Sequence, residues 1–169
     1  MTEKSIREWC IEKGYIDENY HQKHFATFDV ETLAEEKNQI VTDKTYLHCS
    51  QRVVTVSVSR SWGPDEYRSM VFKRRTFSQD EYELFINNFL SHLHELQSLM
   101  VDLMPRKILE SIAYLSEESD AIQRKERNYS PEQANWIRRG LHYLKKLQML
   151  KIYGYNSASY DLPVLFQGK

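Results

Sequence analysis

The segment Phe25-Ala26-Thr27-Phe28-Asp29-Val30-Glu31-Thr32 carries most of the information about the fold. Residues 25–30 are mostly apolar, aromatic or β-branched, which predicts a short buried strand. Asp29 and Glu31 stand two positions apart, so the alternation of side chains along a strand places both carboxylates on one face. Desolvating two acids is costly, and a divalent cation such as Mg²⁺ or Mn²⁺ offsets that cost. The pattern therefore predicts either a metal site or a solvated strand end.

A second strand is expected over residues 52–59, where apolar and polar residues alternate. Val54, Val56 and Val58 fall on one face of that strand, which predicts that the face is buried. The turn-like residues 61–65 and the apolar residues 67–72 then predict a hairpin with a return strand. Residues 32–50 are polar without a clear period, so they are expected to form a loop.

Four stretches with apolar residues at helical spacing follow recognisable helix start signals. The starts are marked by Ser5, by the capping box of Ser78 and Glu81, by Pro105, and by Ser130 with Pro131 and Gln133. Residues 116–130 are nearly all polar or charged, so they are expected to include a solvated segment or an exposed helix end.

Residues 151–156 predict a further strand that leads into a turn, and Asp161 comes at the start of a final helix. If this strand lies beside the first one, Asp161 can complete a carboxylate group with Asp29 and Glu31. Taken alone, the same residues also fit a helix N-cap and a turn. The order of strands and helices predicts an α/β fold with a mixed sheet.

Composition sets the broad class of protein. A chain of 169 residues suits one domain, and 41% hydrophobic with 28% charged residues is ordinary for a globular protein. The net charge of −1 excludes a strongly basic module held to nucleic acid by charge alone. No apolar run reaches the roughly 18 residues of a membrane helix. The start of the chain lacks the hydrophobic region of a secretory signal peptide, and two cysteines do not make a disulfide framework. We therefore expect an intracellular protein without a membrane partner.

Two segments resemble a known family. Phe28-Asp29-Val30-Glu31-Thr32 is similar to the first exonuclease motif, F-D-x-E-T, of family B DNA polymerases. Tyr155-Asn156-Ser157-Ala158-Ser159-Tyr160-Asp161-Leu162-Pro163 resembles the second motif in the N-S-x-x-[YF]-D-L form of protein-primed viral and self-synthesising transposon polymerases. The hairpin strand after His48 and the helical segment before the second motif are similar to that group too. The resemblance covers about residues 25 to 166.

The resemblance implies a partial ribonuclease H-like 3′–5′ proofreading exonuclease domain over residues 25–169. Residues 1–24 would form an N-terminal arm, a helical insertion would cover about residues 101–150, and the last strand and helix of the fold would be missing. Asp29, Glu31 and Asp161 would be the catalytic carboxylates that hold two Mg²⁺ or Mn²⁺ ions. Thr32, Asn156 and Tyr160 would contact the 3′ end of single-stranded DNA.

The chain departs from this family in one respect. The third motif, of the type Y-x-x-x-D, does not follow Asp161, so we expect weak or no turnover without the remainder of a polymerase chain. The alternative is a non-catalytic module that serves protein interaction or homo-oligomerisation. The tail Val164-Leu165-Phe166-Gln167-Gly168 fits either the family's helix or a protease-cleavage scar. The basic residues at 138, 139, 145 and 146 fit either a solvated helix face or a contact with a DNA backbone.

Overall fold

The computed structural model describes residues 5–41 and 44–154, with side chains described outside residues 34–51. The chain has an α/β fold whose described part divides into two compact units. The helical unit contains residues 5–23 and 97–150, and the sheet unit contains residues 24–96 and 151–154. Each unit is described separately.

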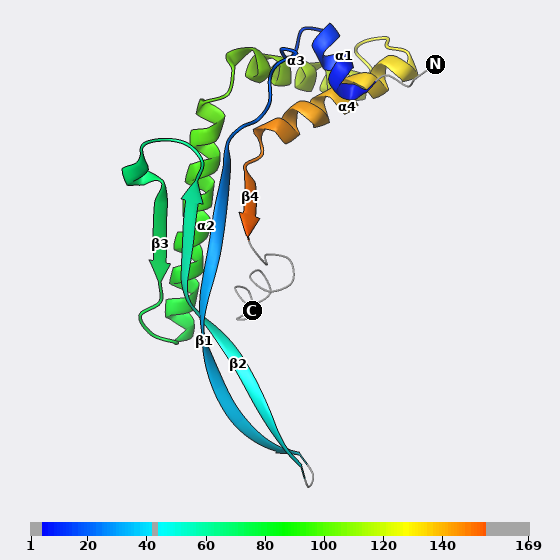
Figure 1. Cartoon of the computed structure of the whole chain (residues 1–169). Helices are drawn as coiled ribbons and strands as arrows, with labels where there is room; N and C mark the ends of the chain where they lie inside the picture. The colour runs from blue at the N-terminus through cyan, green and yellow to red at the C-terminus, as the bar shows by residue number, and fades with distance from the viewer. Residues whose placement is uncertain (1–4, 42–43, 155–169) are drawn as a thin grey trace. The chain divides into compact units, whose positions relative to one another are not determined.

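The sheet unit is built on a four-stranded mixed sheet with the order β3-β2-β1-β4 (Figure 1). Its elements are β1 (Phe25–Val41), β2 (Lys44–Arg60), the 3₁₀ helix η1 (Asp65–Tyr67), β3 (Ser69–Lys73) and β4 (Lys151–Gly154). β1 pairs antiparallel with β2 and parallel with β4, while β2 pairs antiparallel with β3. This arrangement confirms the predicted strand at residue 25, the hairpin and the mixed sheet.

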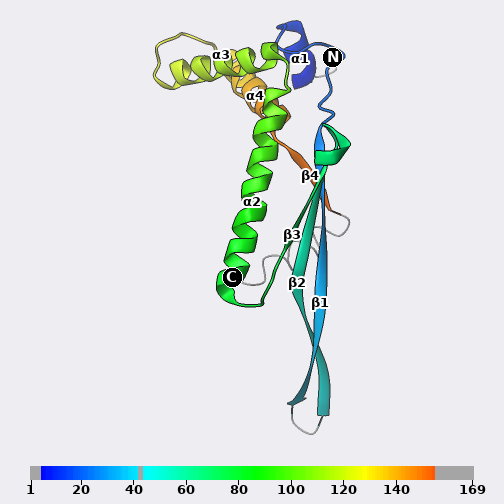
Figure 2. The ribbon, with the colours of Figure 1, turned by 90° about the vertical axis from the view of Figure 1, so that its left-hand side faces the viewer.

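One face of the sheet is covered by α2 (Gln79–Asp102), as Figure 2 shows. Ala26, Phe28 and Val30 of β1 are buried on this face. The ring of Phe89 on α2 lies 6.4 Å from that of Phe28 and 6.1 Å from that of Phe72 on β3. Aromatic contacts of this kind, together with the buried apolar area, hold helix and sheet together.

The prediction of a loop over residues 32–50 is wrong. β1 and β2 continue as a paired ladder out to Val41 and Lys44. Alternating apolar and polar residues indicate a strand with one buried face. The hydrogen bonds between paired strands join backbone groups, so they form without such a pattern of side chains. A long hairpin can therefore form where the sequence shows no period.

A β-bulge alters the expected face of β2. The register shifts between Glu31 and Thr32, because Glu31 pairs with Thr55 and Thr32 pairs with Val53, which leaves Val54 without a partner on β1. Val53 is consequently buried with Val56 and Val58, and Val54 is only half-buried. The prediction that Val54 shares the buried face is wrong, because an extra residue in a strand reverses the side-chain alternation beyond it.

The helical unit contains α1 (Ile6–Glu12), α3 (Arg106–Gln123), α4 (Pro131–Gln148) and the end of α2. Its core includes the fully buried side chains of Cys10, Leu115 and Leu144. Burial in these apolar surroundings raises the pKa of the Cys10 thiol to about 11. The capping boxes confirm two predicted helix starts, with Ser5 and Glu8 at α1 and Ser130 and Gln133 at α4.

One local prediction needs correction. Ser78 accepts a hydrogen bond from the backbone of Glu81, but the Glu81 carboxylate accepts one from the backbone of Arg75 instead of completing the capping box. The exposed helix end expected within residues 116–130 is confirmed at residues 123–128, whereas Glu118 in the same polar stretch is only 2% exposed. Arg127 and Tyr129 donate hydrogen bonds to the Glu118 carboxylate, which is how a buried carboxylate is normally tolerated.

None of the helices in the described part of the chain has the length and apolar character needed to span a membrane.

Candidate functional site

The candidate site lies on the face of the sheet opposite α2, which we call the open face. In β1, alternate residues at 25, 27, 29 and 31 are exposed, whereas those between them are buried. Asp29 and Glu31 therefore share the open face, as predicted from their spacing. Two residues along a strand correspond to roughly 6.6 Å.

Hydroxyl groups from β2 face these two acids. Asp29 pairs across the ladder with Ser57, and Glu31 pairs with Thr55. Thr27 pairs with Ser59, and its hydroxyl donates a hydrogen bond of 3.5 Å to the Ser59 backbone carbonyl. The polar side of the alternating segment 52–59 was the signal in the sequence that could have identified these residues.

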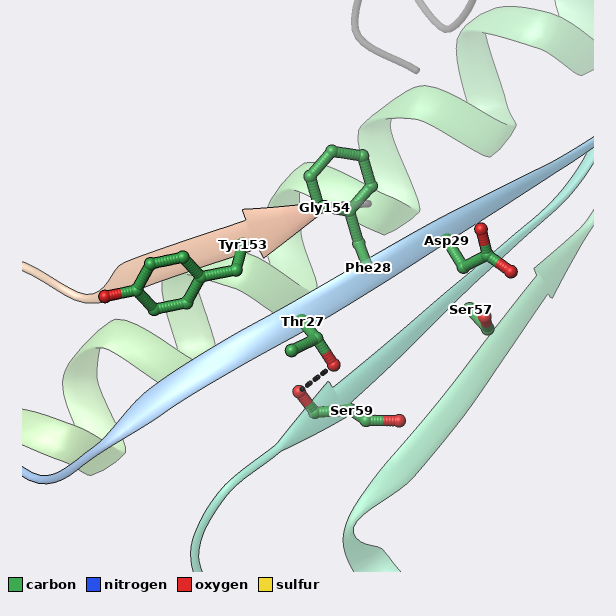
Figure 3. Close-up of a pocket in the computed structure, with 7 residues that line it drawn as sticks. All are labelled: Thr27, Phe28, Asp29, Ser57, Ser59, Tyr153 and Gly154. Atoms are coloured by element: carbon green, nitrogen blue, oxygen red, sulfur yellow. Dashed lines mark hydrogen bonds between the residues drawn. The ribbon is translucent and has the colours of Figure 1, made fainter. Parts of the chain in front are cut away.

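β4 completes the other side of the site. Tyr153 pairs in parallel with Thr27, and Gly154 pairs with Phe28. The ring of Tyr153 meets that of Phe25 edge-on, with centroids 5.7 Å apart. Between β4, β1 and β2 lies a pocket of about 610 Å³ (Figure 3). It is lined by Thr27, Phe28, Asp29, Ser57, Ser59, Tyr153 and Gly154.

Asp29 of the pocket and Glu31 beside it on β1 have no cationic partner among the described side chains. Within residues 5–33 and 52–154, no ion pair joins either carboxylate to a cationic group. The described residues that line the pocket contribute oxygen atoms from one carboxylate and four hydroxyls as their polar side-chain atoms. Such a donor set suits Mg²⁺, Mn²⁺ or Ca²⁺ better than zinc or copper.

Of the remaining predicted site residues, the structure describes Thr32 but not Asn156, Tyr160 or Asp161. Thr32 is half-buried in β1, directly after the register shift. Asn156, Tyr160 and Asp161 lie outside the described residues, so the expected convergence of Asp161 with Asp29 and Glu31 stays a prediction. Among the residues that the structure describes, no group of three or more His, Cys, Asp or Glu side chains could hold a metal ion. Two described carboxylates alone make an incomplete metal site.

Comparisons with models of protein families, with curated proteins and with solved structures gave no match to this chain.

Proposed function

We propose that this chain carries the metal-binding strands of a ribonuclease H-like 3′–5′ exonuclease domain, of the type found in protein-primed family B DNA polymerases. The observation that supports the proposal most directly is the parallel pairing of β4 with β1. β4 leads into the second resembling motif, and β1 contains the first. Gly154, the last residue of β4, pairs with Phe28, so β4 ends beside the part of β1 that bears Asp29 and Glu31, although β1 itself continues to Val41.

In this proposal, Asp29, Glu31 and Asp161 hold two Mg²⁺ or Mn²⁺ ions. When bound, such ions supply an activated water and stabilise the leaving 3′ oxygen of the DNA. Thr32, Asn156 and Tyr160 orient the terminal nucleotide of a single strand. The carboxylate and hydroxyl oxygens of the described pocket lining suit this role, because such ligands favour a hard cation.

The test combines metal binding with nuclease activity. We expect Mn²⁺ to raise the melting temperature of the chain, and to support slow removal of 3′ nucleotides from a single-stranded oligonucleotide. Asp29→Asn with Glu31→Gln should abolish both effects, since each substitution removes a negative ligand at nearly constant shape. Glu66→Gln is the control, because Glu66 is an exposed acid in η1 of the same unit and does not line the pocket. Metal binding and cleavage that survive the double substitution would refute the proposal.

A second candidate is a non-catalytic module for protein interaction or homo-oligomerisation. It is favoured by large apolar side chains that are exposed on the sheet unit, among them Val71 and Tyr153, each 54% exposed. Light scattering separates the two candidates. An inert dimer would favour the second, and a monomer that removes 3′ nucleotides would favour the first.

A further inference from the structure

Beyond its first turn, the exposed side of α4 carries basic residues and no acidic ones. From Asn135 to Lys146 its exposed residues are Asn135, Arg138, Arg139, His142, Lys145 and Lys146. We call the last five of these the basic face. It lies opposite the buried residues Ile137, Gly140 and Leu144, which face the core of the helical unit. No acidic residue interrupts this stretch, although the chain as a whole has a net charge of −1.

Neighbouring acids do not neutralise the basic face. In the described part of the helical unit, ion pairs join Arg106 to Glu110, Lys107 to Asp17, Arg124 to Glu126 and Arg127 to Glu118. None of them includes a residue of the basic face. Arg139 lies 4.9 Å from the ring centroid of Trp136, a contact that orients the guanidinium and leaves its charge in place.

The macrodipole of α4 explains only part of this pattern. Cations are favoured in the last turn of a helix, which accounts for Lys145 and Lys146. Arg138 and Arg139 lie in the middle of the helix, where that effect has faded. A groove of about 340 Å³ runs beside them and is lined by Ile6, Arg138, Arg139, His142, Tyr143 and Lys146. The groove is lined mainly by carbon atoms of these residues, so the stems of Arg138, Arg139 and Lys146 lie along one concave surface beside Ile6 of α1.

We propose that the basic face binds the phosphodiester backbone of a nucleic acid. Arginine suits this role because its planar guanidinium can donate two hydrogen bonds to one phosphate. From Arg138 to Lys146 the helix rises about 12 Å, at 1.5 Å per residue. Each strand of duplex DNA rises about 3.4 Å per nucleotide, so the basic face spans about three or four phosphates of such a strand. This site involves neither Asp29 nor Glu31 and goes beyond the proposed exonuclease function.

Fluorescence anisotropy of the full chain with a labelled single-stranded oligothymidylate tests the proposal. The buffer contains EDTA, so that no divalent ion contributes to binding. We expect the logarithm of the binding constant to fall linearly with the logarithm of the salt concentration, at about −0.7 per phosphate contact. Arg139→Glu with Lys146→Glu should weaken binding at least about tenfold and make the slope less steep by about 1.4.

Matched controls separate this surface from general charge. Lys23→Glu with Lys125→Glu makes the same change of charge at two exposed positions elsewhere in the helical unit, and should leave affinity nearly unchanged. Arg139→Gln with Lys146→Gln repeats the test without charge reversal, and circular dichroism verifies that α4 is intact.

Duplex DNA and single-stranded RNA serve as further ligands and identify the form of nucleic acid that binds best. The proposal is overturned if the basic-face and control variants lose affinity equally, or if affinity does not depend on salt. It is also overturned if vesicles with anionic lipid bind to the basic face while every oligonucleotide fails to bind.

Discussion

Gly140 shows how one side-chain atom can decide the packing of a helix. It lies on the buried side of α4, where the ring of Trp9 from α1 packs against it. A Cβ atom at this position would stand 2.4 Å from Cζ3 of Trp9, well inside van der Waals contact. The same tryptophan ring stacks on Trp136, with centroids 6.0 Å apart, so it has little freedom to move away.

We predict that Gly140→Ala destabilises the protein by about 1–3 kcal/mol, the usual cost of overpacking. This outcome runs against helix propensity, which favours alanine over glycine inside a helix by about 1 kcal/mol. Urea denaturation measures the change. In a Trp9→Ala background the clash is absent, so there Gly140→Ala should be neutral or stabilising. Equal effects in both backgrounds would contradict the packing argument.

The sequence predicted that Asp29 and Glu31 share one face of a strand, but it did not predict which residues of other strands lie beside them. Their common face follows from strand geometry within three consecutive residues, and the structure places them as expected. The lining residues Ser57 and Tyr153 are brought to Asp29 and Thr27 by pairing with β2 and β4. Such pairing joins segments far apart in the sequence, so local patterns could indicate candidates but could not specify partners.

At the scale of elements, prediction succeeded where one face of a strand or helix is buried. The N-caps of α1 and α4, the start of α3 after Pro105 and the apolar stripes of these helices are local signals, and the structure confirms them. It failed for the continuation of β1 and β2, where backbone pairing proceeds without alternation. It failed again at Val54, because a bulge is a property of two paired strands and one strand alone gives no sign of it.

Glu118 joins α3 to the segment that leads into α4. Its buried carboxylate accepts hydrogen bonds from Arg127 and Tyr129. We predict that Glu118→Ala lowers the free energy of unfolding by about 1–3 kcal/mol, because both donors lose their acceptor. Glu117→Ala is the control. Glu117 precedes Glu118 in the sequence but is exposed, and substitutions at exposed positions change the free energy of unfolding by about 0.5 kcal/mol or less.

A double-substitution cycle identifies the cause of that loss. Tyr129→Phe should cost less in the Glu118→Ala background than in the parent, because the hydrogen bond it removes is already absent. Chemical denaturation of the four proteins gives the coupling. Strictly additive effects would mean that Glu118 stabilises the unit by packing alone.

At the scale of the whole molecule, two units with separate cores share one helix. α2 contributes Phe85, Phe89 and Leu96 to the sheet unit and continues into the helical unit, where Met100 is fully buried. The described part of the helical unit is assembled from two stretches of chain, residues 5–23 and 97–150. Local signals predicted its helices one by one, but not that α1 would join a core formed by residues nearly one hundred positions away, because only tertiary packing brings such stretches together.

This organisation predicts how the molecule opens locally. Contacts of Gly140 and Trp9 lie within the helical unit, so Gly140→Ala should lower hydrogen-exchange protection in α1, α3 and α4 and leave β1, β2 and β3 nearly unchanged. Val56→Ala, which creates a cavity in the sheet unit, should produce the opposite pattern. Peptides from α2 are the most informative, because residues 79–96 should follow the sheet unit and residues 97–102 the helical unit. A uniform loss of protection for either substitution would show that the chain unfolds as one cooperative body, with α2 transmitting the destabilisation along its length.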